Sequence, residues 1–591
     1  MGRWKKRASL GATATSLRRR IMPATSAGTL ATGSRVESPL MQAAPTPSGA
    51  PEPTQKSVLQ RFLRLFRPSH QHTAFSATVL LAATILLSRM VGFLREIYVA
   101  WAFGATSITD AYNAGFQIPD LVNYFAAGGT ASITFISIYT RFLAQKREED
   151  ARKTFSVIVT IMSLVLIAGI ALGEIFAPQL NRLMFGKMPA AEFELCVHIC
   201  RILLPAQLFF YIGGVASAVL LARRMFFLPA IGPLFYSGGI ILGGLLFSRY
   251  LGISSMAYGG VTGCFLGIFL VNVIGAAKAG IGFRISFDIH NPAFREWIRL
   301  SVPLMLGVSL VATDEWIQRH FAVKFTGDIT RLTYARRFFQ APIAVLGQAV
   351  GQASLPFFAR LFGEKRFSEF SATVNSSIYR FGSAAILVSS FMMSAALPLI
   401  DLLYRRGHLT FSDSQVTSVF FFWFSLSLVF WAVQGLYARA FYAAGNTLTP
   451  MIASTIIVLA SLPMYAALFR NFSTVGLIAA SDIGIAVNCS VIAILLHRRG
   501  LVTLAGLPWT EIGKTGFTAV AAGIVAIKVG TFIPLRGSRF DDLKSLAVTT
   551  IVWVAVVALG LWLLKSKLPS DLRRRKDAQL SPSAAGNLPS E

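Results

Sequence analysis

The stretch Ala74–Ala102, AFSATVLLAATILLSRMVGFLREIYVAWA, is apolar almost throughout and carries Arg89 and Arg95 well inside it. A helix needs roughly 20 predominantly apolar residues to cross a bilayer, so this stretch predicts a membrane span. A charge at the bilayer centre costs roughly 2.5–3.5 kcal/mol on insertion scales and usually faces a bundle interior or an aqueous cavity. The two arginines therefore predict a polar cavity for an anionic cargo. For Arg95, pairing with Glu96 or reaching the membrane surface is the alternative.

The rest of the chain continues this pattern. Of its 591 residues, 54% are hydrophobic and only 14% are charged, whereas soluble domains carry about 25% charged residues. Long apolar segments recur, for example at 156–176, 225–247, 384–404 and 548–564. Counting all such segments predicts an all-α integral membrane protein with about fourteen transmembrane helices.

The basic residues of this chain, which has a net charge of +28, are unevenly placed. They gather at both termini and in every second loop, so that the loop Arg141–Lys153 is strongly basic while the loop Gly104–Thr109 has no basic residue. Cytoplasmic loops carry such an excess. The pattern predicts an even number of spans with both termini in the cytoplasm, and it argues against a nucleic-acid partner.

The ends of the chain differ from its apolar middle. Residues 1–55 are rich in Ala, Ser, Thr, Pro and Arg and lack an apolar period, which predicts a disordered basic extension. Residues 56–72 place apolar and basic side chains on different helical faces, which predicts an amphipathic segment on the inner membrane surface. Residues 567–591 are expected to form a cytoplasmic tail.

Two short sequences recur at nearly the same offset. Ala131–Ile136 (ASITFI) resembles Ala353–Phe358 (ASLPFF), and Leu221–Arg223 (LAR) resembles Tyr437–Arg439 (YAR). Parallel repeats of this kind relate by an axis along the membrane normal and suit alternating access. We therefore expect two pseudo-symmetric six-helix lobes, the first at 73–285 and the second at 286–500, followed by two C-terminal helices within 501–566.

No catalytic pattern emerges from the sequence. It has no Gly-rich phosphate-binding loop of the Walker type, and its aqueous loops are too short for a catalytic domain. The four cysteines fall in apolar segments, so neither a disulfide framework nor a metal site is expected. The sequence predicts a transporter that uses no cofactor, not an enzyme.

Several motifs, in their order along the chain, resemble those of the MurJ (MviN) family of lipid II flippases. The resemblance extends from Ala74 to the C-terminal spans. The motifs are Ser88–Glu96 (SRMVGFLRE), Phe103–Ala105 (FGA), Thr109–Ala111 (TDA), Tyr334–Arg337 (YARR) and Ala438–Tyr442 (ARAFY).

The resemblance implies the fold of the multidrug/oligosaccharidyl-lipid/polysaccharide exporter superfamily. It also implies a function: flipping undecaprenyl-pyrophosphate-linked disaccharide-pentapeptide (lipid II) from the inner to the outer leaflet by alternating access, for cell wall biogenesis. The implied location is the bacterial cell inner membrane, and the implied partners are lipid II, membrane lipids and cell wall synthesis proteins. The two C-terminal helices within 501–566 would form a groove for the polyprenyl tail.

The family's cavity residues carry over onto Arg89, Arg95, Asp110 and Arg337. The sequence departs from the family at Asn123, where the family has a cavity arginine, and at Arg336, where it has an aspartate. Both positions remain in the predicted cavity. Some members hold a sodium ion, for which Asp314 is the candidate ligand here.

Two other functions remain open. The first is a flippase or exporter for another polyprenyl-linked oligosaccharide or a small cation, although a cation antiporter needs membrane carboxylates where this chain has arginines. The second is a transport-inactive membrane scaffold, which would retain its function after Arg89, Arg95 and Arg337 are all replaced.

Overall fold

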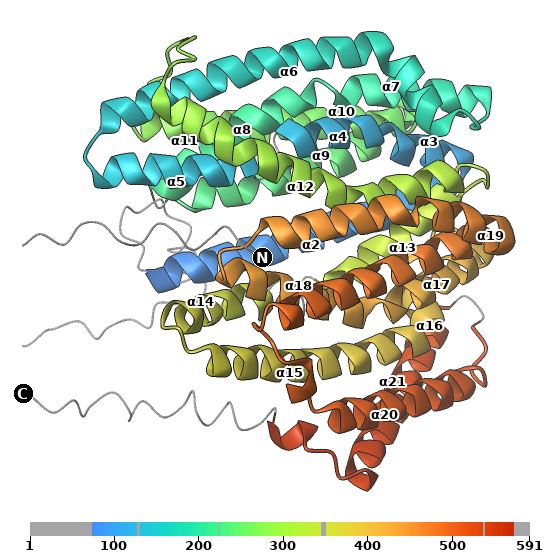
Figure 1. The fold of residues 1–591 in the computed structure, drawn as a ribbon. Coiled ribbons are helices and arrows are strands. Elements are labelled where there is room, and N and C mark those ends of the chain that lie inside the picture. Colours follow the sequence, from blue (N-terminus) through green and yellow to red (C-terminus); the bar gives the residue numbers. More distant parts are fainter. Residues whose placement is uncertain (1–73, 127–129, 224, 344–349, 536–537, 572–591) are drawn as a thin grey trace, which may run out of the picture. The chain divides into compact units, whose positions relative to one another are not determined.

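The computed structural model describes residues 74–126, 130–223, 225–343, 350–535 and 538–571. Within these ranges the chain forms helices and no β-strand (Figure 1), which confirms the predicted all-α class. The predicted disordered extension and amphipathic segment lie outside the described residues, as do residues 572–591 of the predicted tail.

The described residues of the first half form ten α-helices and one π-helix. They are α2 (Ala74–Phe103), α3 (Ser107–Gly115), α4 (Gln117–Ala126), α5 (Thr130–Ala144), α6 (Glu148–Phe185), α7 (Ala190–Leu203), α8 (Ala206–Ala222), α9 (Phe227–Leu251), α10 (Ser254–Gly263), η1 (Cys264–Leu270) and α11 (Val271–Lys278).

The second half begins at α12, where Asn291 caps the helix by accepting hydrogen bonds from the backbone of Ala293 and Phe294. Its helices are α12 (Pro292–Ala322), α13 (Asp328–Ile343), α14 (Val350–Gly363), α15 (Phe367–Ser394), α16 (Ala396–Tyr404), α17 (Phe411–Leu426), α18 (Leu428–Ala443), α19 (Leu448–Arg498), the short 3-10 helix η3 (Leu504–Gly506), α20 (Trp509–Gly530) and α21 (Arg539–Leu563).

Many of these helices are long and apolar. Among the described residues, eight helical segments are long and apolar enough to cross a membrane, or nine if α15 and α16, bent by 66°, count as one span. The 51-residue α19 is itself two helices, because Ser473 interrupts it with φ 52° and ψ −139°. The chain is therefore a multi-pass membrane protein, and the count of fourteen spans stays a prediction.

The helices of the two halves pack in matching pairs. In the first half α3 packs on α7, α5 on α8 and α2 on α9; in the second half α13 packs on α17, α14 on α18 and α12 on α19. The two sequence repeats lie in this matching frame, since Ala131–Ile136 belongs to α5 and Ala353–Phe358 to α14. The structure thus has the expected internal repeat, while the predicted lobe boundaries stay predictions.

The last two helices, α20 and α21, pack against each other and against α15. The Ser390 hydroxyl on α15 donates to the carbonyl oxygen of Ala519 at 2.5 Å and accepts from the Trp553 indole at 3.2 Å. Large apolar side chains, among them Phe517 and Ile551, remain exposed on this helix pair. The pair is thus fastened to the second half and presents an apolar surface.

Candidate functional site

A buried carboxylate on α2 interacts with arginines from both halves of the chain. Glu96 is 7% exposed and accepts a hydrogen bond from the adjacent Arg95 at 2.6 Å. Arg337 on α13 approaches the same Glu96 oxygen to 3.8 Å. The structure therefore brings two of the predicted arginines together and places a carboxylate between them.

Arg89 has a different environment from Arg95 on the same helix. Its side chain is exposed, and it makes no hydrogen bond or ion pair with any other described residue. Arg95 thus adopts the alternative of pairing with Glu96, and the cavity role of Arg89 stays a prediction.

A second group of charges lies where α12 and α13 meet α4. Arg319 pairs with Glu315 at 2.5 Å and donates to the Gln117 amide oxygen at 2.8 Å, while Arg336 pairs with Asp314 at 2.7 Å. Asp120 on α4 interacts electrostatically with Arg319, Arg337 and Arg95. The site therefore holds positive and negative side chains in comparable number. Such pairing stabilises the site, because an unpaired buried charge is costly.

The prediction from the sequence missed this balance. Glu96 entered it only as an alternative partner for Arg95, and Arg319 and Glu315 had no assigned role. Their position inside apolar segments was a usable signal, because ionisable residues within spans mark functional sites by default. An incoming anion must compete with Glu96 for Arg95 and Arg337.

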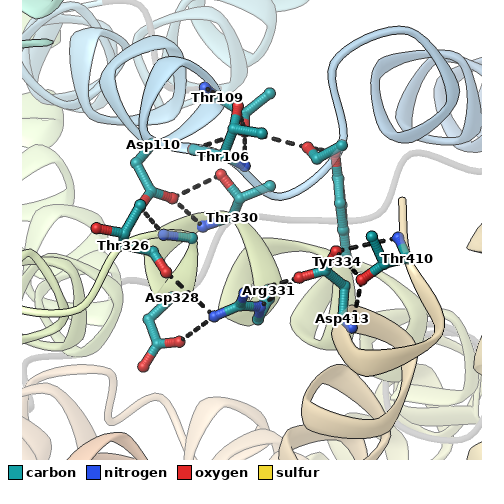
Figure 2. Close-up of polar contacts among 12 residues, drawn as sticks. Thr106, Thr109, Asp110, Thr326, Asp328, Thr330, Arg331, Tyr334, Thr410 and Asp413 are labelled. Carbon is teal, nitrogen blue, oxygen red and sulfur yellow. Dashed lines mark hydrogen bonds and ion pairs between the residues drawn. The ribbon is translucent and has the colours of Figure 1, made fainter. Parts of the chain in front are cut away.

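Asp110 lies at a distinct place, where α3 meets the start of α13 (Figure 2). Its carboxylate accepts from the backbone nitrogens of Gly327 and Thr330 at 2.5 and 2.8 Å and from the Thr330 hydroxyl at 2.7 Å. Asp110 is 5% exposed. It caps a helix of the other half, and we call Asp110, Gly327 and Thr330 the latch. The described contacts of Asp110 do not include the arginines.

Further hydrogen bonds connect the two halves near the latch. The backbone nitrogen of His408 donates to the carbonyl oxygen of Trp101 at 3.0 Å, and the Tyr334 hydroxyl donates to that of Gly104 at 3.4 Å. A Cβ atom added at Gly407 would lie 2.0 Å from the Trp101 oxygen, so only glycine permits this approach.

The second half also stabilises its own side of the latch. Figure 2 shows Arg331 between Asp328 and Asp413, which it contacts at 2.9 and 2.7 Å. Asp413 in turn forms a capping box with Thr410 at the start of α17. Arg331 thus ties the first turn of α13 to the first turn of α17.

The remaining predicted residues are bonded to side chains on neighbouring helices. The Asn123 amide on α4 donates to the Gln207 side chain on α8 at 3.0 Å. Asp314 accepts from Arg336 on one oxygen and from the Tyr465 hydroxyl on the other. Protein donors use both Asp314 oxygens and Arg336 supplies a positive charge beside them. The cation site at Asp314 stays a prediction.

Comparisons with known proteins agree with these features. The family model described as lipid II flippase MurJ matches residues 99–534. A probable lipid II flippase MurJ of Rickettsia prowazekii is 27% identical over 418 residues, which are 70% of this chain and 81% of the relative. The lipid II flippase MurJ of Burkholderia cenocepacia is 24% identical over 520 residues, covering 85% of this chain and 99% of the relative.

Solved structures extend the comparison to the fold. A lipid II flippase MurJ in an inward closed conformation matches with a TM-score of 0.69 and 20% identity, over 82% of this chain and 99% of that one. An inward-facing multidrug resistance MATE family transporter of the MOP superfamily matches with a TM-score of 0.60 and 14% identity, over 72% of this chain and 98% of that one. At these identities the likeness establishes the fold.

Proposed function

Because the chain belongs to the MurJ family of lipid II flippases, we propose that it moves lipid II from the inner to the outer leaflet of a bacterial inner membrane. It is a transporter and not an enzyme. In this proposal both termini lie in the cytoplasm, as the basic loops predict, and cell wall synthesis proteins receive the cargo. The observation that carries the proposal is the pair of arginines, one from each half, that share Glu96.

The cargo's pyrophosphate replaces Glu96 as the anion between Arg95 and Arg337. A guanidinium presents a planar fork that binds phosphate oxygens in a bidentate manner, with stronger bonds than a neutral donor makes. Arg89, which is exposed and unpaired among the described residues, makes the first contact. Asn123 and Arg336 belong to the same cavity. Asn123 connects helices there by its hydrogen bond to Gln207, and Arg336 does so by its ion pair with Asp314.

Alternating access follows from the placement of these groups on both halves. An anion held by Arg95 and Arg337 favours the state in which α2 and α13 converge, because a ligand shifts an equilibrium through its differential affinity for the two states. Opening the sealed side requires the latch to break together with the His408–Trp101 hydrogen bond. The cargo thus leaves on the side that the latch closes.

The polyprenyl tail lies against α20 and α21 in this proposal. Their exposed apolar side chains offer a surface with the chemistry of the membrane interior. A cavity of about 660 Å³, lined mostly by apolar residues such as Leu561 and Trp562, lies at the end of α21. The headgroup and tail would therefore travel along separate parts of the protein.

The test is a flipping assay in proteoliposomes with labelled lipid II, compared with an O-antigen-type lipid of another glycan. Arg95→Ala and Arg337→Ala are each expected to slow lipid II flipping about tenfold or more, since bonds from charged donors contribute about 1.5–3 kcal/mol. Arg366→Ala is the matched control, because Arg366 is also paired with carboxylates but lies on the exposed α14–α15 connection.

Each outcome distinguishes one hypothesis. Flipping of lipid II at the wild-type rate by the Arg95→Ala/Arg337→Ala double variant would overturn the role of these arginines. Faster transport of the other glycolipid would assign a different polyprenyl-linked cargo. Support of growth by a triple variant that also carries Arg89→Ala, in cells depleted of their own flippase, would favour the scaffold.

A further inference from the structure

A group of basic side chains breaks the charge pattern of the loops. Arg182 and Lys187, at the end of α6, and His320 and Lys324, at the end of α12, line one cavity of about 310 Å³. The helix α6 starts at the basic loop Arg141–Lys153 and crosses the membrane, so its far end lies on the side predicted to face outward. Outward-facing loops usually contain few basic residues, and these four therefore call for a specific explanation.

These basic side chains lack the carboxylate partners that the central arginines possess. Arg95, Arg319, Arg336 and Arg337 each lie beside a carboxylate. None of the four side chains around the outer cavity forms an ion pair with a carboxylate among the described residues, and the residues that line the cavity include no Asp or Glu. The outer cavity is thus more electropositive than the region around the central arginines.

Aromatic rings and a backbone bond hold the cluster in place. The Arg182 guanidinium lies 5.6 Å from the centre of the Phe193 ring, and the Lys324 ammonium lies 5.0 Å from that of Phe469. The His320 Nδ1 contacts the carbonyl oxygen of Met184 at 2.6 Å, which connects the ends of α12 and α6.

The plainer explanation is that these basic side chains offset the negative ends of two helix dipoles. A side chain in this role can also donate to the last carbonyl oxygens of a helix. His320 makes such a contact, to α6, whereas Arg182, Lys187 and Lys324 form no hydrogen bond with a terminal carbonyl among the described residues. The N–H donors of Arg182, Lys187 and Lys324 therefore remain available for an anion.

We propose that this outer cavity binds a phosphate-type anion, namely the diphosphate headgroup of the cargo after it has crossed the membrane. The inference rests on the proposed function. The cavity volume lies at the lower end of the roughly 300–1,000 Å³ range of ligand sites, so it accommodates the diphosphate and not the attached disaccharide-pentapeptide. Lys324 precedes Gly327 of the latch by three residues, so an anion held here contacts the segment that must move when the latch opens.

The test measures anion binding without requiring transport. Full-length protein in phosphatidylcholine nanodiscs is titrated calorimetrically with inorganic pyrophosphate, in an Arg95→Ala/Arg337→Ala background that removes the two arginines beside Glu96. We expect binding that weakens about tenfold or more in Lys187→Ala/Lys324→Ala, because charge-assisted bonds to phosphate are lost. Lys187→Arg/Lys324→Arg is expected to retain binding, which separates loss of charge from misfolding.

The matched control is Lys528→Ala/Lys544→Ala, which removes two exposed lysines from α20 and α21, outside the cavity. Equal pyrophosphate affinity in the cavity and control variants, or no binding in the background protein, would overturn the proposal. Loss of pyrophosphate binding on changing to phosphatidylglycerol nanodiscs would assign the cavity to an anionic phospholipid and overturn the cargo assignment. Failure of the wild-type protein to flip lipid II in proteoliposomes would instead count against the proposed function, since the binding measurement does not depend on transport.

Discussion

The Asp110 carboxylate on α3 accepts hydrogen bonds from both the backbone nitrogen and the hydroxyl of Thr330 on α13, at 2.8 and 2.7 Å. These residues belong to opposite halves of the chain, so a single side chain of one half caps a helix of the other. A carboxylate at a helix N-terminus gains from the unpaired N–H groups and from the helix dipole. This relationship makes the latch a point at which access can be controlled.

Replacing Asp110 with alanine is expected to open the latched side. Each hydrogen bond to a charged group contributes about 1.5–3 kcal/mol, so the closed population falls when all three bonds are lost. The measurement is labelling of a Thr333→Cys variant by a membrane-impermeant maleimide, because Thr333 is 7% exposed behind the latch. The native cysteines Cys196, Cys200, Cys264 and Cys489 are buried and give little background. Unchanged labelling rates after Asp110→Ala would show that the latch does not hold this side closed.

Gly407→Ala is expected to have a similar effect through a steric clash. Its Cβ would lie 2.0 Å from the Trp101 oxygen, so the halves must separate there. Gly445→Ala is the matched control, because Gly445 has φ +74° but open space around its Cβ position. Both variants carry the strain of a positive φ, and only Gly407→Ala should raise Thr333→Cys labelling. Equal labelling in the two variants would mean that backbone strain, and not the clash with Trp101, causes the effect.

Glu96→Gln is expected to strengthen anion binding at the central arginines. The change removes the charge that competes with phosphate for Arg95 and Arg337, which lie 2.6 and 3.8 Å from Glu96. We expect the dissociation constant for inorganic pyrophosphate to fall several-fold, with Lys187→Ala/Lys324→Ala present to remove the outer cavity. The exposed Glu364→Gln, which also loses an arginine-paired carboxylate, serves as the control. Weaker binding in Glu96→Gln would mean that Glu96 positions the arginines for the anion.

Arg336→Gln is expected to destabilise the protein by leaving Asp314 without its ionic partner. Breaking a fully buried pair from one side costs about 3–5 kcal/mol, whereas replacing both partners is far less costly; this pair is partly buried, so a smaller loss in the same direction is expected. The Tm in detergent should therefore fall more for Arg336→Gln than for Arg336→Gln/Asp314→Asn. Sodium chloride and potassium chloride at equal ionic strength should give the same Tm for the wild type, because protein donors use both Asp314 oxygens. Stabilisation by sodium alone would support the predicted cation site at Asp314.

The sequence by itself determined the class of the protein. Runs of apolar residues such as Ala74–Ala102 cannot be stable in water, so composition and length predict membrane helices without any knowledge of packing. The two short repeats predicted the two-fold organisation that the matching pairs α3–α7 and α13–α17 display. Arg95 was also identifiable, because a charge within an apolar segment is costly wherever the fold places it, whereas Arg337 was identified through the family motif Tyr334–Arg337.

Only the tertiary structure decided how these charges are partnered. Arg89 and Arg95 occupy the same apolar run, yet one is exposed and the other is bonded to Glu96. Asp110 and Thr330 are separated by 220 positions along the chain, and the latch exists because packing brings α3 to the start of α13. The energy of a charge depends on its distance from other charges and from water, and the folded arrangement of helices sets both distances.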